Sequence, residues 1–286
     1  MIDDFLSSLM YAIPVAIVML VAFMIMRAVY GKHVGLHGYS YADSIVNGNT
    51  AAAIRFVGIF FGSTLGFWGV LSPTGLGLIN DLARIVQCLV LVITFMVVAG
   101  YINDKLILHK IDNLKAIFHE ANLSVALVEC GTFIATGLIL AASQSGDSTF
   151  LSNVMWFLGG QILLAGATYL FAFLHGGLPG VDEMHESMNV DNRSYAFSLF
   201  GFTVSVGIVL NVLIKNVDKP VAAILSLLAW VVVTFLLQFI FNRLMVPGRN
   251  LVSMVGMKAA TAPNTGAGLL QGSMFLASAL VITVLN

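Results

Sequence analysis

Long apolar runs separated by short polar breaks limit this chain to a membrane fold. Eight segments reach the length of about 20 residues that one helix needs to cross a bilayer. The chain is 59% hydrophobic and only 9% charged, whereas soluble domains carry about a quarter charged residues, so a soluble globular fold is excluded. Lipid cannot satisfy backbone N–H and C=O groups, so we expect each segment to be a helix. The segments are 6–30, 50–71, 82–103, 122–143, 150–175, 192–214, 219–243 and 263–285.

The first of these segments is expected to be a retained transmembrane helix. It follows Asp3 and Asp4 instead of a basic region, and its apolar stretch exceeds the 7–15 residues of a signal-peptide core. The net charge is −1 and no basic run occurs, so the expected partner is the lipid bilayer and not a nucleic acid. Both cysteines, Cys88 and Cys130, lie within apolar segments and are interpreted as buried thiols.

The basic residues predict the orientation, because Lys and Arg favour the cytoplasmic side. The loops on one side, with the adjoining helix ends, hold nine of them and the other side holds three. The nine are Arg27, Lys32, Lys105, Lys110, Lys115, Arg193, Arg243, Arg249 and Lys258, and the three are Arg84, Lys215 and Lys219. Both termini are therefore predicted to be periplasmic. The stretch 105–122 alternates apolar and basic residues, which favours a helix that leaves the membrane or lies on its inner surface.

Four of the segments begin in the same way. Each starts at an asparagine and carries small residues two, nine and thirteen positions later. An asparagine at such a position caps a helix, and the small residues form a stripe that allows close backbone approach in membranes. The four asparagines are Asn49, Asn122, Asn192 and Asn264. The pattern predicts either four helical hairpins in one orientation or two parallel four-helix repeats, 1–145 and 146–286, in an all-α polytopic membrane protein.

These stretches also carry a resemblance to a known family. "YSYADSIVNGNTAAAIRFVGIFFG" and "APNTGAGLLQGSMFLASALVITVLN" resemble the opening and closing signatures of the YjfL-like bacterial inner-membrane proteins (domain of unknown function 350). "VDEMHESMNVDNRSYAFSLFG" is similar to a second, more diverged opening. The resemblance implies a four-helix unit present in two tandem copies and a location in the bacterial inner membrane. It implies no established activity and no catalytic residues.

Polar residues interrupt the four matching helices at two neighbouring positions. Arg55 stands six residues after Asn49, and Glu129 stands seven residues after Asn122. The corresponding residues of the second half are Ser198 and Gln271. At 1.5 Å per residue the two charges lie about 9–11 Å past their helix starts, at similar depth. Three interpretations are open: a structural ion pair, a permeation or proton pathway that also uses Ser198 and Gln271, or snorkelling of Arg55 to the interface.

The remaining polar residues do not define a metal or cofactor site. All six histidines fall on the basic side of the membrane, which argues against a haem held between facing helices. His175, His185 and Glu186 are of the residue types that bind divalent metals, but their spacing is not diagnostic. We therefore expect no metal and no cofactor. Enzyme motifs such as G-x-S-x-G, H-E-x-x-H and the Walker loop are absent from the sequence, so an enzyme is not expected.

Two classes of function fit this sequence. The first is a small-solute or ion transporter or channel, with a polar site between the four matching helices. The second is a non-transporting scaffold in an envelope-stress or membrane-organisation system, in which the small-residue stripes are contact faces. A homo-oligomer or a membrane-protein partner is compatible with both. The charges of Arg55 and Glu129 favour transport, because ionisable residues inside a membrane are costly.

Overall fold

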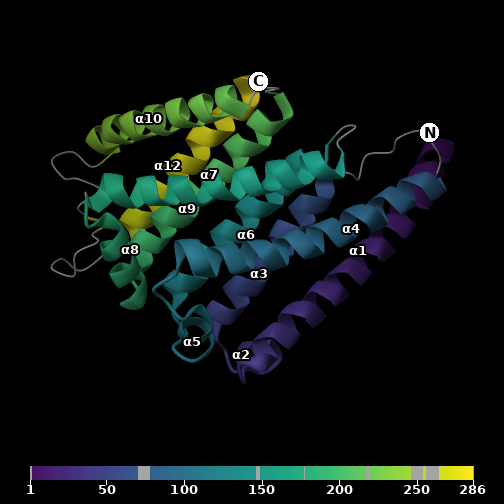
Figure 1. The fold of residues 1–286 in the computed structure, drawn as a ribbon, viewed down its shortest axis with the longest axis horizontal. Coiled ribbons are helices and arrows are strands. Elements are labelled where there is room, and N and C mark those ends of the chain that lie inside the picture. The colour runs from purple at the N-terminus through teal and green to yellow at the C-terminus, as the bar shows by residue number, and fades with distance from the viewer. Residues whose placement is uncertain are drawn as a thin grey trace.

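The structure, a computed structural model, is helical, and each of the eight predicted segments coincides with one long helix (Figure 1). It describes residues 2–69, 78–145, 149–176, 178–216, 220–245, 254–255 and 264–285. The long helices are α1 (Ile2–Leu36), α3 (Thr50–Trp68), α4 (Leu78–Ile102), α6 (Leu123–Ser143), α7 (Phe150–Gly176), α9 (Arg193–Asn216), α10 (Pro220–Met245) and α12 (Thr265–Leu285). Shorter elements between them are α2 (Tyr41–Val46), the π-helical turn η1 (Asn103–Ile107), α5 (Asn113–Phe118) and α8 (Gly180–Asn189).

The helices make this a multi-pass membrane protein. Within the described residues, seven helices are long and apolar enough to cross a bilayer. The eighth, α12, contributes a shorter apolar stretch, Thr265–Val281. Eight crossings and periplasmic termini therefore stay predictions. Lys219, Arg249 and Lys258, which contribute to the predicted orientation, and the predicted segment ends at 70–71, 219 and 263 lie outside the described residues.

The four helices that follow the asparagines, α3, α6, α9 and α12, are here called the motif helices. They pack in chain order, α3 on α6, α6 on α9 and α9 on α12. The helices α4, α7 and α10 pack against them, and α1 packs against α4. Figure 1 shows this progression across the molecule, from purple α1 at one side to α10 and yellow α12 at the other. The apolar window of α6 is 89% buried, against 11% for α1 and 28% for α10. Of the motif helices, α6 and α9 are therefore the most buried, with 67% for the window of α9, whereas α3 and α7 are equally buried at 50%.

Close backbone contact between the motif helices depends on their glycines. A Cβ atom on Gly137 of α6 would lie 2.0 Å from the backbone oxygen of Gly62 of α3. A Cβ atom on Gly201 of α9 would lie 2.4 Å from the Cα atom of Gly272 of α12. No larger residue fits at either place without moving a backbone. This confirms the predicted packing of these helices through small residues.

Each motif helix begins directly after its asparagine, whose side chain accepts a hydrogen bond from the backbone N–H three residues on. The side-chain amide has a second role at two of the caps. Asn49 donates to the carbonyl of Ile117 at 2.9 Å, and Asn122 donates to the carbonyl of Met188 at 2.7 Å. Both acceptors lie shortly before the start of the next motif helix. One residue therefore caps its own helix and ties it to the following hairpin.

The residue before the asparagine adopts a left-handed backbone conformation at each of the three places where the structure describes it. The φ angles are +81° at Gly48, +51° at Ala121 and +53° at Asp191. Glycine adopts this conformation without strain, whereas alanine does not. Asp191 uses its side chain, since its Oδ1 accepts a hydrogen bond from the backbone N–H of Ser124 at 2.8 Å. Ala121 has no side-chain polar group that could make such a hydrogen bond. The turn is therefore strained at Ala121.

Replacement of Ala121 by glycine is expected to stabilise the protein. The left-handed region costs a residue with a Cβ about 1–2 kcal/mol, and the extra chain entropy of glycine offsets about 0.5–1 kcal/mol of the gain. Thermal unfolding in detergent should thus show a free energy of unfolding raised by about 0.5–1 kcal/mol. The matched control, Ala126→Gly inside α6, should lower stability instead. A loss of stability in Ala121→Gly would contradict the backbone geometry described for this turn.

The stretch 105–122 differs from its prediction. No single helix spans it, neither one that leaves the membrane nor one that lies on the membrane surface. Instead α4 ends in the π turn η1, the chain turns, and the short helix α5 packs against α3 and α6. Five of the six residues of α5 are buried. The apolar residues of this stretch cover the starts of α3 and α6. Helical periodicity alone does not show whether apolar residues face other helices or a membrane surface.

Candidate functional site

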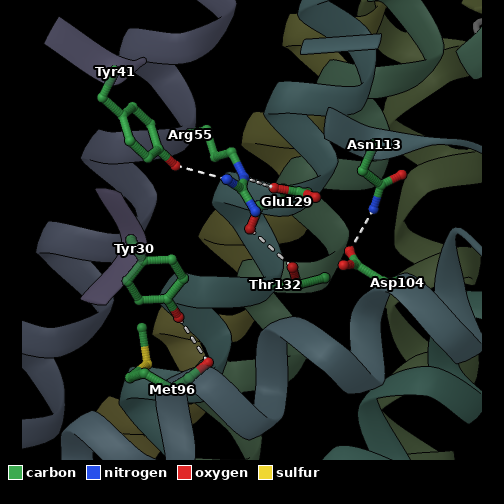
Figure 2. Close-up of polar contacts among 8 residues, drawn as sticks. All are labelled: Tyr30, Tyr41, Arg55, Met96, Asp104, Asn113, Glu129 and Thr132. Atoms are coloured by element: carbon green, nitrogen blue, oxygen red, sulfur yellow. Dashed lines mark hydrogen bonds and ion pairs between the residues drawn. The ribbon is translucent and has the colours of Figure 1, made fainter. Parts of the chain in front are cut away.

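Arg55 lies inside the protein and is held by two hydrogen bonds. Its side chain is on α3 and is 2% exposed. The Nε group donates to the Glu129 carboxylate, and one terminal nitrogen donates to the Tyr41 hydroxyl at 2.7 Å (Figure 2). The guanidinium carbon lies 6.0 Å and 5.9 Å from the ring centroids of Tyr41 and Phe118. The planar, forked guanidinium suits this combination of carboxylate, hydroxyl and aromatic contacts, which an ammonium does not reproduce.

Glu129 is the ionic partner of Arg55 and is also buried, at 1% exposure. It stands on α6, and its Oε2 atom accepts the hydrogen bond from Arg55. The other carboxylate oxygen, Oε1, has no hydrogen-bond partner among the described residues. The geometry thus contains the ion pair expected from the sequence, and snorkelling of Arg55 is wrong because the guanidinium is enclosed. The pair leaves one oxygen of a buried carboxylate unsatisfied.

A second carboxylate belongs to the same cluster, and the sequence interpretation missed it. Asp104 lies on the π turn η1 and interacts electrostatically with both Arg55 and Glu129. Asn113 of α5 donates to its Oδ1 atom at 2.6 Å. The cluster around Arg55 and Glu129 therefore holds a second carboxyl group. Asp104 falls one residue beyond the predicted segment 82–103, and the π turn, which is frequent at functional sites, directs it into the cluster.

Tyr41 is another member of the cluster that the sequence did not indicate. It is the first residue of α2 and is buried beside Arg55 and Phe118. Burial raises the pKa of Tyr41 to about 12 against the lowering effect of Arg55. The phenol is therefore neutral and accepts the hydrogen bond from the guanidinium. Its only signal in the sequence is its place in "YSYADS", eight residues before Asn49.

A cavity of about 250 Å³ gives access to this cluster between α1 and α4. Its polar lining comes from Tyr30, His33, Arg55, Tyr101 and Asp104. The Tyr30 hydroxyl donates to the backbone carbonyl of Met96 on α4 at 2.9 Å, which joins the two helices at the cavity (Figure 2). A water-sized or slightly larger polar species in this cavity would meet Arg55 and Asp104.

The second pair of predicted residues is also brought together, with a third partner. The Ser198 hydroxyl of α9 donates to Oε1 of Gln271 on α12. The Gln271 amide nitrogen lies 3.1 Å from Nε2 of His175, whose Nδ1 lies 2.9 Å from the carbonyl of Phe171. With this amide orientation, a neutral His175 satisfies every member of the network. His175, the last residue of the predicted segment 150–175, lies in the last turn of α7 and packs on Phe171.

The two pairs occupy equivalent places in successive helices. In each, the residue six positions after one asparagine meets the residue seven positions after the next. At the α6–α9 interface the same positions are Val128 and Leu199, both fully buried. Arg55 with Glu129 lies between α3 and α6, whereas Ser198 with Gln271 lies between α9 and α12. The predicted polar residues therefore form two separate interfaces and not one site shared by all four motif helices.

The residues considered as metal ligands have protein partners or face solvent. The two ring nitrogens of His185 lie 2.7 Å and 3.0 Å from the carbonyls of Val181 and Ile107. Burial lowers the pKa of His185, so this histidine is a neutral structural group. Glu186 is exposed on α8. Within the described part of the chain, no group of three or more His, Cys, Asp or Glu side chains has a geometry that could hold a metal ion.

A second cavity, of about 350 Å³, lies at the opposite end of the motif helices. All four of them line it: Leu65 and Trp68 of α3, Leu138 and Ala141 of α6, Ile208, Asn211 and Lys215 of α9, and Leu280 and Thr283 of α12. Asn211 donates to the carbonyl of Leu138 at 2.6 Å. The cavity near Arg55 thus meets α3 close to its start, whereas this second cavity meets α3 at its end.

The fold and the cluster define a helical multi-pass membrane protein with a buried ionic site in its first half. The family model described as Domain of Unknown Function (DUF350) matches residues 1–144, 77–189 and 145–285, and the chain belongs to this family. No curated protein and no solved structure matches the chain. The YjfL-like resemblance seen in the sequence agrees with this family.

The positions of the three matches suggest a repeated arrangement. Two of them, 1–144 and 145–285, follow one another along the chain. The third, 77–189, starts near the beginning of α4 and ends with α8, so it is displaced by one hairpin. Such a displacement is expected if the smallest repeated unit is a hairpin. Each hairpin would hold one long helix such as α1 or α4, a connection and one motif helix. The division into repeats 1–145 and 146–286 stays a prediction.

Proposed function

We propose that this protein transports a small ion across the bacterial inner membrane and that the Arg55 cluster, composed of Tyr41, Arg55, Asp104, Asn113 and Glu129, is its ion-handling site. One observation carries the proposal: the buried Glu129 carboxylate has an unpartnered oxygen in a cluster that a cavity reaches. An ion pair that only stabilises packing has its remaining lone pairs satisfied by the protein. An unsatisfied buried carboxylate oxygen is instead suited to bind and release a positively charged species.

The cost of the site supports the same proposal. Ionisable residues within a membrane are expensive and mark ion pathways or proton relays more often than packing contacts. In the corresponding position of the second half, a neutral serine–glutamine pair joins α9 to α12. At the α6–α9 interface, two apolar residues occupy these positions. Helix packing in this fold therefore does not require charge, and the charge in the first half needs another reason.

Passage through the protein would require motion of α3 relative to α6. The two cavities meet α3 close to its start and at its end, and between them Gly62 and Gly137 bring the backbones into contact. Separation of these two helices would connect the cavities past Arg55 and Glu129. Alternating closure of the two ends is the general mode of transporters built from internal repeats. We propose the cytoplasm on the side of the Arg55 cluster, both termini in the periplasm, and no enzymatic activity.

Ion-jump currents on solid-supported membranes test this proposal. Purified protein in liposomes is exposed in turn to steps of H⁺, Na⁺, K⁺ and Cl⁻. We expect a current above that of protein-free liposomes for a cation, and a fall to the protein-free level in Glu129→Gln. The matched control Glu186→Gln makes the same chemical change on exposed α8 and should retain the current. Wild-type protein without current for any of these ions would reject ion transport.

A scaffold is the second candidate, favoured by one surface feature. Val57, Phe61 and Trp68 lie on α3 with side chains that are 45%, 55% and 70% exposed. Their spacing of four and seven residues places them along one stripe of the helix. A contact with a second copy or another membrane protein would cover this stripe. Cysteine crosslinking from position 61 in native membranes would detect such a contact, and crosslinks to lipid alone would oppose it.

A further inference from the structure

The unpartnered oxygen of Glu129 stands beside another carboxyl group. Asp104 lies close enough to Glu129 for their charges to interact, and Asn113 donates to Oδ1 of Asp104 at 2.6 Å. Figure 2 shows Asn113 and Asp104 on the side of Glu129 away from Tyr41. Two ionised carboxylates have only acceptor oxygens, so neither can donate a hydrogen bond to the other. A proton shared by the two groups would be the donor to Oε1 of Glu129. This accounts for an oxygen to which no described protein group donates.

We infer that Asp104 and Glu129 share one exchangeable proton and that the cavity between α1 and α4 connects it to water. The biological role of this proton rests on the proposed function. The inference adds that the transported or coupling ion is H⁺. One carboxyl group carries the proton as O–H and donates to an oxygen of the other. On release, the O–H bond breaks, the proton passes to water in the cavity, and both groups are carboxylates. Close carboxylate pairs elsewhere share a proton for the same electrostatic reason.

The charges around the pair agree with a single proton. Within the described elements, α3 contributes Arg55 and α2 contributes the neutral Tyr41. From α1, Tyr30 and His33 line the cavity, and α6 contributes the buried thiol of Cys130 next to Glu129. After Asp104 the chain places Lys105, which is exposed and lies 6.0 Å from the ring centroid of Tyr101. Enclosed in the cluster are thus one cation and two carboxyl groups, and one proton makes it neutral.

The two carboxyl groups differ in their access to water. Asp104 lines the cavity and is partly exposed, whereas Glu129 is 1% exposed and is not part of the cavity lining. Asp104 is therefore the group that exchanges the proton with water, and Glu129 is the inner group. Arg55, which is fixed by Glu129 and Tyr41, does not donate a described hydrogen bond to Asp104. Asn113 donates to the Oδ1 atom of Asp104, and a proton held between the two carboxyl groups would supply the donor for Oε1 of Glu129.

Infrared difference spectroscopy of purified protein in lipid tests the inference without a transport assay. The wild type, stepped from neutral to alkaline pH, should lose a protonated-carboxyl C=O band, and this band should shift in D₂O. Asp104→Asn and Glu129→Gln should each lack the band, because an amide replaces the shared donor. Asp182→Asn, which changes an exposed carboxylate paired with Lys110 at 2.5 Å, is the matched control and should retain it.

The outcomes separate this inference from the proposed function. A wild-type protein without such a band, or a band that persists unchanged in both single variants, overturns the shared proton even if ion currents are present. A band that both variants lose, in a protein that shows no ion current, supports the shared proton and rejects transport. If one variant does not fold, the wild-type spectrum and the other variant decide the question.

Discussion

Replacement of Arg55 by methionine is expected to destabilise the protein by about 3–5 kcal/mol, the usual cost of removing one partner of a buried ion pair. The methionine fills a similar volume but leaves two carboxyl groups, Glu129 and Asp104, without the cation that faces them. Tyr41 also loses the group that donates to its hydroxyl. Thermal unfolding in detergent and the yield of monodisperse protein measure the effect.

The double variant Arg55→Met/Glu129→Gln should recover most of this loss. It removes both charges, and replacement of a whole buried pair by neutral groups is often close to neutral in stability. Arg27→Met is the matched control, because Arg27 is exposed on α1, and it should change stability by less than about 0.5 kcal/mol. Equal losses in Arg55→Met and Arg27→Met would mean that the buried pair does not stabilise the fold.

Gly137→Ala is expected to destabilise the protein strongly although it adds only one methyl group. The new Cβ atom would lie 2.0 Å from the backbone oxygen of Gly62 and 2.6 Å from its carbonyl carbon. Neither atom can move without displacing α3 from α6, so the cost should reach or exceed the about 1–3 kcal/mol of ordinary overpacking. Lower folded yield and a lower unfolding temperature in detergent are the expected results.

Gly159→Ala is the matched control for this substitution. Gly159 lies within α7, and a Cβ atom there would have nothing within 4 Å. Alanine is the better helix former by about 0.5–1 kcal/mol, so this variant should be as stable as the wild type or more stable. A Gly137→Ala protein with wild-type stability would show that α3 and α6 are not in backbone contact.

Much of this fold follows from short-range features of the sequence. The length of the apolar segments predicts the long helices, and an asparagine before a run of small residues predicts where each motif helix starts. The matching positions of the four helices also place Arg55 and Glu129 at similar depth. Those relations depend on helix geometry, which the sequence determines locally. The small-residue stripes predict that these helices pack closely, but not the order in which they do so.

The residues that sequence reasoning missed are positioned by tertiary contacts. Asp104 reaches the cluster because α4 ends in a π turn, which no periodicity indicates. His175 looks like part of a glycine-rich loop, but α7 continues to Gly176 and buries the ring against Phe171. The stretch 105–122 looks like a surface helix because its apolar residues fit either a membrane surface or the starts of α3 and α6. In each case the local sequence fits both the expected structure and the observed one, and contacts with distant residues decide between them.

The ion current of the double variant Arg55→Met/Glu129→Gln tests the central claim most directly. If the Arg55 cluster is the ion-handling site, this variant should regain near-wild-type stability and yet give no current above protein-free liposomes. A double variant that is stable and conducts like the wild type would contradict the account, because the charged pair would then serve the fold alone.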